Sequence, residues 1–393
     1  MGETNRHQER PEVSIVIPCL NEAETLGGCI RKAHEVIDKH NLSAEIVVAD
    51  NGSHDGSPEI ARDLGARLVH APVKGYGAAL MAGIEAARGT YVVMADADGS
   101  YDFGAILPFI EKLRQGYSLV MGCRFPRGHG TIMPEAMPWS HRWLGNPILT
   151  GVGRLFFRSP VSDFNCGLRA FRRDTVTALD LRTTGMEFAS EMVIRATLKG
   201  VPIAEIPITL YKDGRTRPPH LRRWRDGWRH LRFMLLYSPS WLFLIPGCVF
   251  FFLGAASGGV LLSGPVQIWG IGFDTNTLLV SAMVMLLGFK LIAFAVFAKV
   301  FAISEGLLPE DPSLSKVFRF VTLEVGILIG LLCMLAGFGL LGEGVLYWRR
   351  HDFGPLSYPD SLRLVIPGVT ALTLGVEIIF SSFFMSMLGL RRR

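Results

Sequence analysis

Four long apolar stretches occupy the part of the sequence that follows Ser240, and they limit what this part can fold into. A helix needs roughly 20 apolar residues to cross a hydrocarbon core about 30 Å thick. Each stretch reaches that length, so the sequence predicts a transmembrane domain over residues 240–393. The predicted spans are 241–262, 277–301, 320–341 and 364–388.

Flanking charges predict the orientation of this domain. An even number of spans puts both of its ends on the same side of the membrane. Residues 1–11 are polar and charged, so we expect a disordered N-terminus without a signal peptide, and a first domain on the cytoplasmic side of the cell (inner) membrane. The terminal residues 391–393 are all arginine, which agrees with this orientation, whereas Arg349 and Arg350 in the predicted outer loop do not.

Two charged residues, Lys290 and Glu377, fall near the middle of the second and fourth predicted spans. An isolated charge is costly at that depth, so both are expected to face the interior of the helix bundle. We predict that they form an ion pair that fixes helix packing. In the alternative interpretation, one of them lines a path for a lipid or a sugar.

Composition narrows the classes of protein that fit. Apolar residues make up 49% of the chain and the mean hydropathy is +0.31, which is high for a soluble protein. The formal net charge of +5 is modest for 393 residues and gives no support to nucleic-acid binding. Six cysteines show neither a Cys-x-x-Cys pair nor metal-ligand spacing, so we expect reduced thiols without a disulfide framework.

Residues 12–218 alternate short β-rich runs with helical patterns. Strands that alternate with helices predict βαβ units and a mainly parallel sheet, which is a Rossmann-like α/β domain. In such sheets ligands bind at the carboxyl ends of the strands. The runs expected as strands are 13–18, 45–50, 66–70, the run that starts at Tyr91, and 119–124.

Carboxylates follow three of these strands. Asp96 and Asp98 lie one residue apart, and in an extended segment their side chains would face one target. Two hard oxygen ligands there suit Mg²⁺ or Mn²⁺, which in turn would clamp a diphosphate. Glu22 and Asp50 would join them in one crevice. The alternatives are a solvated turn for the Asp pair, a helix cap for Glu22, and local loop hydrogen bonds for Asp50.

Lys74 precedes a glycine-flanked helix start. It could meet a phosphate at the N-terminus of that helix, or it could be an exposed loop lysine.

Four ordered motifs in this domain resemble the motif series of family 2 glycosyltransferases with the GT-A fold. Within that family the chain is most similar to the polyprenyl-phosphate glycosyltransferases, the dolichol-phosphate mannose or glucose synthase group, over residues 12–220. The resemblance implies a nucleotide diphosphate sugar as donor and Mg²⁺ or Mn²⁺ as cofactor. The motifs are Pro18-x-x-Asn21-Glu22, Asp50-Asn51-Gly52-Ser53-x-Asp55-Gly56, Lys74-Gly75-Tyr76-Gly77 and Asp96-Ala97-Asp98.

The resemblance also implies a set of donor-site residues. Asp98 would be the principal metal ligand, with Asp96 beside it. Ser100 stands where the family often has glutamine, so its role is open. The donor residues implied are Pro18, Leu20 and Glu22 at the nucleotide, Val48 and Asp50 near base and ribose, and Asp96 and Ala97 at the ribose and diphosphate.

Further motifs resemble the acceptor side of the same family. The run Gly122-Cys123-Arg124 is similar to the family's Gly-Ser-Arg, and a guanidinium binds phosphate oxygens well, so Arg124 is our candidate for the acceptor phosphate. By resemblance, Asp163 would organise the reaction centre and Arg169 would help to hold phosphate. Glu191 is the better candidate of two nearby glutamates, although a solvated helix face would explain it nearly as well. Between these motifs, 126–160 is expected to form a mobile loop and a membrane-facing helix.

The loop 211–217 loosely resembles the family's Arg-x-x-Gly-x-Ser-Lys motif. Gly214 fits the glycine, and Thr216 and Arg217 replace serine and lysine. We expect Arg217 to reach the donor diphosphate, and the role of Tyr211 stays open.

Arginines and tryptophans interleave over residues 219–239, directly before the first apolar span. This pattern predicts an amphipathic helix that lies on anionic lipid headgroups.

The spacing of the residues alone predicts a metal–diphosphate crevice next to a membrane. The family resemblance supplies the substrate class and implies an inverting glycosyltransferase that moves a hexose from a UDP-glucose or GDP-mannose type of donor to undecaprenyl or dolichyl phosphate. One alternative is a processive polysaccharide synthase, whose Gln-x-x-Arg-Trp motif is nearly matched by residues 220–224, with His220 in place of glutamine. Another is a non-catalytic scaffold that binds nucleotide sugars. The expected partners are the donor, the lipid and the membrane, without nucleic acid, and a homo-oligomer is compatible with the sequence.

Overall fold

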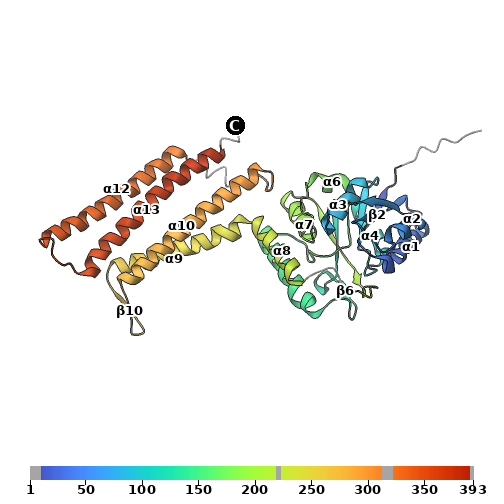
Figure 1. The fold of residues 1–393 in the computed structure, drawn as a ribbon, viewed down its shortest axis with the longest axis horizontal. Coiled ribbons are helices and arrows are strands. Elements are labelled where there is room, and N and C mark those ends of the chain that lie inside the picture. The colour runs from blue at the N-terminus through green and yellow to red at the C-terminus, as the bar shows by residue number, and fades with distance from the viewer. Residues whose placement is uncertain (1–9, 218–222, 312–321, 390–393) are drawn as a thin grey trace, which may run out of the picture. The chain divides into compact units, whose positions relative to one another are not determined.

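The computed structural model describes residues 10–217, 223–311 and 322–389. The chain separates into two units, residues 1–234 and 235–393, which are drawn in Figure 1. Predictions that concern residues 1–9, His220 and residues 391–393 lie outside the described ranges.

A seven-stranded sheet forms the centre of the first unit, in the order β3-β2-β1-β4-β7-β5-β8. Pairing is parallel throughout, except that β7 runs antiparallel to both of its neighbours. The predicted α/β fold with a mainly parallel sheet is therefore confirmed. The strands are β1 Val13–Cys19, β2 Ala44–Asp50, β3 Arg67–His70, β4 Tyr91–Met94, β5 Leu119–Cys123, β7 Arg169–Arg172 and β8 Ile203–Pro207.

The reversed strand β7 positions the segment that carries Asp163 and Arg169. Its first residue, Arg169, pairs with Met94 at the end of β4 and with Met121 in β5. The chain that leads into β7 therefore lies at the edge where the parallel strands end.

Helices of ordinary length connect these strands. The helix α1 begins directly after Glu22, whose position favours a negative charge near the positive end of the helix. The region 126–160 contains the short helices η2 and η3, the short strand β6 and the helix α5, and Trp143 of η3 and Ile148 of α5 are exposed. These elements are α1 Ala23–Lys39, α2 Ser57–Asp63, α3 Tyr76–Ala86, η1 Phe103–Ala105, α4 Ile106–Arg114, η2 Pro126–Gly128, β6 Thr131–Ile132, η3 His141–Gly145, α5 Asn146–Phe157, α6 Arg173–Ala178, α7 Phe188–Leu198 and β9 Thr209–Leu210.

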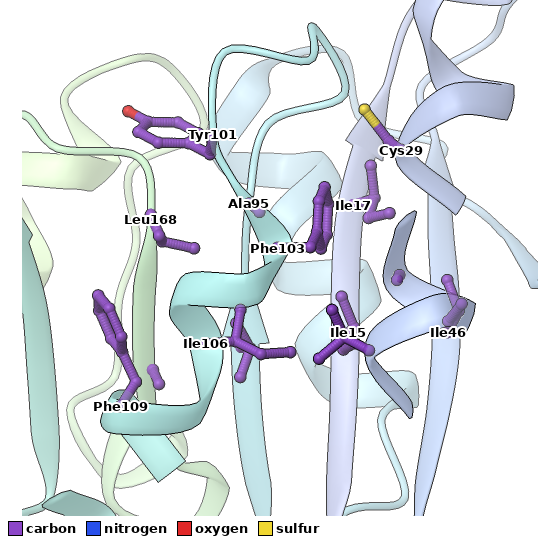
Figure 2. Close-up of a cluster of buried hydrophobic side chains, with 14 of the residues drawn as sticks. Ile15, Ile17, Cys29, Ile46, Ala95, Tyr101, Phe103, Ile106, Phe109 and Leu168 are labelled. Carbon is purple, nitrogen blue, oxygen red and sulfur yellow. The ribbon is translucent and has the colours of Figure 1, made fainter. Parts of the chain in front are cut away.

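The core lies between the sheet and the helices that cover it. Ile15 and Ile17 of β1 lie beside Ile46 of β2, and Phe103 and Ile106 reach them from the segment after β4 (Figure 2). Full burial of one such side chain contributes about 1.5–3 kcal/mol. This packing fixes the strands whose ends carry the polar residues.

The helix α8, Arg223–Leu236, buries a polar face as well as apolar side chains. Asp226, His230 and Met234 follow each other at intervals of four residues and are all buried. His230 Nδ1 lies 2.8 Å from Ser190 Oγ of α7. On the other face Trp224 is 92% exposed and Trp228 is 58% exposed. The predicted pattern of arginines and tryptophans thus accounts for the exposed face of this helix, but not for its buried face.

The buried His230 makes the stability of the first unit depend on pH. Burial lowers its pKa from 6.5 to about 4. Between those values the unfolded chain binds a proton that the folded chain does not, so stability is full above pH 6.5 and falls toward pH 4. We expect a loss of up to about 3 kcal/mol at the acid end. Thermal unfolding of His230→Gln against pH should lack most of this loss, whereas the exposed His54→Gln should retain it. Equal pH profiles for all three proteins would contradict the prediction.

In the second unit the structure describes four helices that are long and apolar enough to cross a membrane: Ser240–Leu262, Thr275–Ser304, Leu323–Arg350 and Tyr358–Leu388. They overlap the predicted spans, but the second, third and fourth are longer than predicted. The third continues to Arg350, where an ion pair of 3.3 Å joins Arg350 to Glu343. The two arginines expected in an outer loop therefore lie on its last turn. The elements are η4 Ser240–Leu244, α9 Ile245–Leu262, β10 Val266–Ile268, β11 Ile271–Phe273, α10 Thr275–Ser304, α12 Leu323–Arg350 and α13 Tyr358–Gly389.

Glycines bring these helices together in two hairpins, α9 with α10 and α12 with α13 (Figure 1). A Cβ on Gly288 would lie 2.2 Å from the backbone nitrogen of Phe251, and one on Gly375 would lie 2.6 Å from the carbonyl oxygen of Gly330. Small residues at such contacts are typical of helices in membranes. Each hairpin is therefore closely packed in itself.

Polar and aromatic contacts connect the two hairpins. Lys290 Nζ of α10 lies 3.1 Å from Glu377 Oε1 of α13, so the predicted ion pair is confirmed. The expectation that both side chains face the interior of the bundle is wrong for Lys290, whose side chain is 56% exposed, whereas that of Glu377 is 18% exposed. The rings of Phe297 and Phe384 pack edge to face with centroids 4.8 Å apart.

Removing the Glu377 charge should weaken the connection between the hairpins. Glu377→Gln leaves the Lys290 ammonium without its carboxylate in an apolar environment, and we expect a loss of roughly 1–3 kcal/mol. Unfolding by SDS titration from mixed micelles would measure it. Glu343→Gln, which alters an exposed pair, should cost less than Glu377→Gln. The ion-pair interpretation fails if the two variants unfold alike, or if Lys290→Met does not reduce the effect of Glu377→Gln.

Candidate active site

The carboxyl ends of β1, β2, β4 and β5 lie at one edge of the sheet, together with the start of β7. Glu22 follows β1, Asp50 ends β2, Asp98 follows β4 and Arg124 follows β5. These four predicted site residues thus come from four parallel strands whose carboxyl ends share one edge, with β7 between β4 and β5.

A cluster of two carboxylates and two guanidinium groups lies at this edge. Arg215 bridges the carboxylates, with its Nε 3.1 Å from Glu22 Oε2 and its Nη2 3.0 Å from Asp98 Oδ2. Arg217 Nη2 lies 2.9 Å from Glu22 Oε1. Glu22 is buried, and the side chain of Asp98 is 17% exposed. The carboxylates are therefore neutralised by arginines from a segment far away in the sequence.

Hydrogen bonds hold that arginine segment at the edge. The amide of Gly214 donates to the carbonyl of Asp98 at 2.9 Å. Thr216 donates its amide and its hydroxyl to the carboxylate of Glu24, at 2.8 and 2.6 Å. Arg217 also donates to the carbonyl of Leu20 at 3.1 Å. Arg215 was not predicted, because it occupies a variable position of the motif and gave no signal beyond its charge.

The two oxygens of Asp98 have different environments. Oδ1 accepts hydrogen bonds from the amide and the hydroxyl of Ser100, at 3.0 and 2.6 Å. Oδ2 is left to Arg215. Ser100, whose role the sequence left open, therefore orients the carboxylate of Asp98.

Asp96 points to a different partner. Its Oδ1 accepts a hydrogen bond of 2.8 Å from the buried hydroxyl of Tyr76. Its Oδ2 lies 2.2 Å from the position that a Cβ on Gly167 would occupy. Burial and the nearby charge of Asp98 raise the pKa of Asp96 from 3.8 to about 6.

The expected extended strand through both aspartates is wrong. The strand β4 ends at Met94, and a turn follows that carries Asp96 and Asp98. The two carboxylates are close, yet they contact different groups.

The loop after β2 is closed by its own side chains. The carboxylate of Asp50 accepts the amides of Gly52 and Ser53, each at 3.1 Å, which is the local role weighed above as an alternative. Lys74 is exposed and donates to the carbonyl of Asn51 at 2.8 Å. The Asn51 side chain in turn binds the backbone of the segment before α3. Asn51 is thus a loop-fixing residue to which the motif comparison gave no role.

Other predicted donor residues are apolar and buried, so their side chains supply no polar group to a ligand. These residues are Pro18, Val48 and Ala97.

Arg124 and Asp163 form a buried pair. The guanidinium donates from Nε and Nη2 to the two carboxylate oxygens, at 2.7 and 2.8 Å, and the amide of Arg124 donates to the same carboxylate at 3.1 Å. Such a two-point contact fixes the plane of the guanidinium. Asp163 therefore orients Arg124, and the remaining Nη1 carries no hydrogen bond to the part of the chain that the structure describes.

The geometry corrects the expectation that Arg169 holds phosphate. Its buried guanidinium donates to three backbone carbonyls, those of Cys166 at 2.8 Å, Phe164 at 2.8 Å and Ala189 at 2.6 Å. Burial lowers the pKa of this guanidinium from its ordinary value. Arg169 thus shapes the chain that leads into β7.

Glu191 is also enclosed by protein. Its carboxylate accepts the amide and the hydroxyl of Thr183, at 2.8 and 2.6 Å, and the amide of Arg182 at 3.1 Å. Arg195 Nε lies 3.2 Å from it. Full burial excludes the solvated helix face that the sequence also allowed for this residue.

Among the described residues, no group of three or more Asp, Glu, His or Cys side chains is arranged to hold a metal ion.

Two protein-family models match the chain. Glycosyl transferase family 2 matches residues 14–180, and the glycosyltransferase family 2 C-terminal transmembrane region matches residues 296–389. The matches fall on the two units separately.

Similar proteins extend this finding. The low-salt glycan biosynthesis hexosyltransferase of Haloferax volcanii is 35% identical over 380 residues, which are 96% of this chain and 89% of that protein. The dolichyl-phosphate hexose transferase of the same organism is 31% identical over 50% of this chain and 82% of that protein. A solved structure, glucosyl-3-phosphoglycerate synthase of Mycobacterium tuberculosis with Mn²⁺ and UDP, is 22% identical with a TM-score of 0.44, over 57% of this chain and 78% of that one. The chain therefore belongs to the family 2 glycosyltransferases, as a catalytic domain followed by that family's C-terminal transmembrane region.

Proposed function

We propose that this glycosyltransferase transfers a hexose from a nucleotide diphosphate sugar to the phosphate of a polyprenyl phosphate, with inversion at the anomeric carbon. The observation that carries the proposal is the charged edge of Glu22, Asp98, Arg215 and Arg124 in a chain with four candidate membrane spans. Relatives named as a dolichyl-phosphate hexose transferase and an undecaprenyl-phosphate 4-deoxy-4-formamido-L-arabinose transferase support the lipid acceptor.

The donor diphosphate fits the part of the edge that Arg215 and Arg217 occupy. Both guanidinium groups now pair with carboxylates and could exchange them for phosphate oxygens, which they bind in the same planar geometry. When the bond to the anomeric carbon breaks, the departing nucleotide diphosphate keeps the electron pair of that bond and gains negative charge. Cations at this position stabilise that charge.

Mg²⁺ or Mn²⁺ fits the same position. Asp98 Oδ2 already faces a positive charge, that of Arg215, and Ser100 fixes the opposite oxygen. Hard carboxylate oxygens suit both metals, and Asp96 lies nearby. When bound there, the ion would supply Lewis-acid stabilisation of the leaving diphosphate.

The acceptor needs orientation more than activation. A phosphate monoester is already anionic at neutral pH, so its oxygen can attack the anomeric carbon without a strong general base. Arg124, held in plane by Asp163, offers Nη1 to that phosphate. A single direct displacement, in which the new bond forms opposite the one that breaks, gives inversion.

We further propose that the first unit works on the cytoplasmic side of the cell membrane. Arginines of α8, such as Arg225, Arg229 and Arg232, directly precede the first span. Positive residues next to a span favour the cytoplasmic side.

A product assay tests the function directly. Purified protein in detergent is incubated with Mn²⁺, undecaprenyl or dolichyl phosphate, and radiolabelled UDP-glucose or GDP-mannose in parallel. Label is expected in a lipid that mild acid hydrolyses. Label in a long polymer would favour a processive synthase instead, and donor binding without any product would favour a scaffold.

Asp98→Asn should lower kcat/KM in this assay by about a thousandfold, because it removes the charge that would hold the metal and the diphosphate. Asp102→Asn is a matched control, because this exposed aspartate only caps the turn η1. Retention of full activity in Asp98→Asn would exclude the proposed donor site.

Arg215 should compete with metal at Asp98. Arg215→Gln frees Asp98 Oδ2, so Mn²⁺ alone should bind roughly fivefold tighter, which corresponds to about 1 kcal/mol. The same variant should bind UDP or GDP more weakly, because a phosphate-binding cation is lost. Titration of free Mn²⁺ by electron paramagnetic resonance measures the first effect, and Arg62→Gln on the surface of α2 is the control. Unchanged Mn²⁺ affinity in Arg215→Gln would show that the two cations do not share Asp98.

A further inference from the structure

Glu191 lies on α7 and organises a neighbouring loop, residues 181–185. The amides of Arg182 and Thr183 and the hydroxyl of Thr183 all donate to its carboxylate. Both the carboxylate and its ion-pair partner Arg195 are buried. A buried charge with this many donors holds the backbone that supplies them.

The 181–185 loop packs against the glycine-flanked turn that starts α3. The carbonyl of Thr184 accepts the amide of Ala78 at 3.2 Å. A Cβ on Gly75 would lie 2.1 Å from the same carbonyl oxygen, and one on Gly77 would lie 2.6 Å from the carbonyl oxygen of Thr183. Gly75 also has a φ of 135°, which side-chain-bearing residues rarely adopt. A side chain at either glycine would overlap the loop, so the two glycines allow the loop and the turn to pack this closely.

Tyr76 lies between these two glycines. Its buried hydroxyl donates to Asp96 Oδ1 at 2.8 Å. The other oxygen of Asp96 is confined by Gly167, where no Cβ would fit. The position of Tyr76 thus determines how the Asp96 carboxylate is held.

We propose that Glu191 and Tyr76 are positioning residues for the donor: Glu191 fixes the 181–185 loop, the loop fixes the turn around Tyr76, and Tyr76 orients Asp96. The proposal rests on the proposed function, because that function assigns Asp96 to the donor and its metal. It gives Glu191 a role away from the reacting atoms, although the sequence placed this residue among the catalytic candidates.

A reacting carboxylate would have different surroundings. A general base must come within hydrogen-bond reach of the proton that it removes. Every contact given above for Glu191 is with its own loop or with Arg195, and its side chain is fully buried. These contacts are those expected of a residue that supports a backbone segment.

Two conservative substitutions at opposite ends of this chain of contacts test the proposal. Tyr76→Phe removes only the hydroxyl, and Glu191→Gln removes the charge while it keeps one acceptor oxygen. Both should raise the KM for the donor and the Kd for UDP or GDP with Mn²⁺ by roughly tenfold, with little change in kcat, as expected for groups that orient a ligand-binding carboxylate. The donor KM and the nucleotide Kd of the double variant should be about the same as those of the more impaired single variant, because both residues act through Asp96.

Matched controls use residues of the same type outside this contact chain. Glu111→Gln removes an exposed carboxylate on α4, and Tyr117→Phe removes a hydroxyl next to the amino end of β5. Both should behave like the natural protein. All assays are run well below the unfolding temperature of each variant.

Three results would overturn the proposal. A fall in kcat of a hundredfold or more in Glu191→Gln, with an unchanged donor KM and with Tyr76→Phe normal, would make Glu191 a reacting group. Lower thermal stability with unchanged nucleotide binding in both variants would make the contacts merely structural. Additive effects in the double variant would break the link between the two residues. If the natural protein makes no lipid-linked sugar, the proposed function fails, but calorimetric binding of UDP or GDP with Mn²⁺ still decides the inference.

Discussion

The pairing of β7 with both β4 and β5 holds the catalytic unit together. In the sheet that the structure describes, β3, β2, β1 and β4 form one parallel group and β5 and β8 form another, and they meet only through this reversed strand. A parallel connection would place the start of β7 at the opposite edge. Because β7 is reversed, the chain before it, with Asp163 and Gly167, lies between Asp96 and Arg124. The groups proposed for the donor and for the acceptor share one edge for this reason.

Charge is balanced in two different ways at that edge. Arg124 and Asp163 are both buried and satisfy each other at two points, an arrangement that is rigid and costly to break. Arg215 and Arg217 lie on a segment held by Gly214 and Thr216, and the side chains of Arg217 and Asp98 are more exposed than those of Arg124 and Asp163. The Arg124–Asp163 pair therefore suits a group that orients a ligand. Arg215 and Arg217 suit cations that exchange their partners when a ligand binds.

Sequence patterns predicted the architecture of the protein better than they predicted the contacts of individual side chains. Alternating strands and helices, the apolar spans and the Lys290–Glu377 pair follow from periodicity and from the cost of charge in lipid, which act along the chain itself. The reversed β7 was not predicted, since four residues with two arginines carry no strand signal. The partner of a side chain depends on segments that are distant in sequence. For this reason the motifs named Arg169 and Glu191 but not the carbonyls and amides that enclose them.

The connection between the two helical hairpins has a consequence for biogenesis. The chain is made from its N-terminus, so the helix that carries Lys290 enters the bilayer before the one that carries Glu377 has been synthesised. During that interval the Lys290 ammonium group lacks the carboxylate with which it pairs in the folded protein. The order of synthesis therefore makes the arrival of the last helix the step that completes the membrane unit, and the insertion machinery must tolerate an uncompensated charge until then.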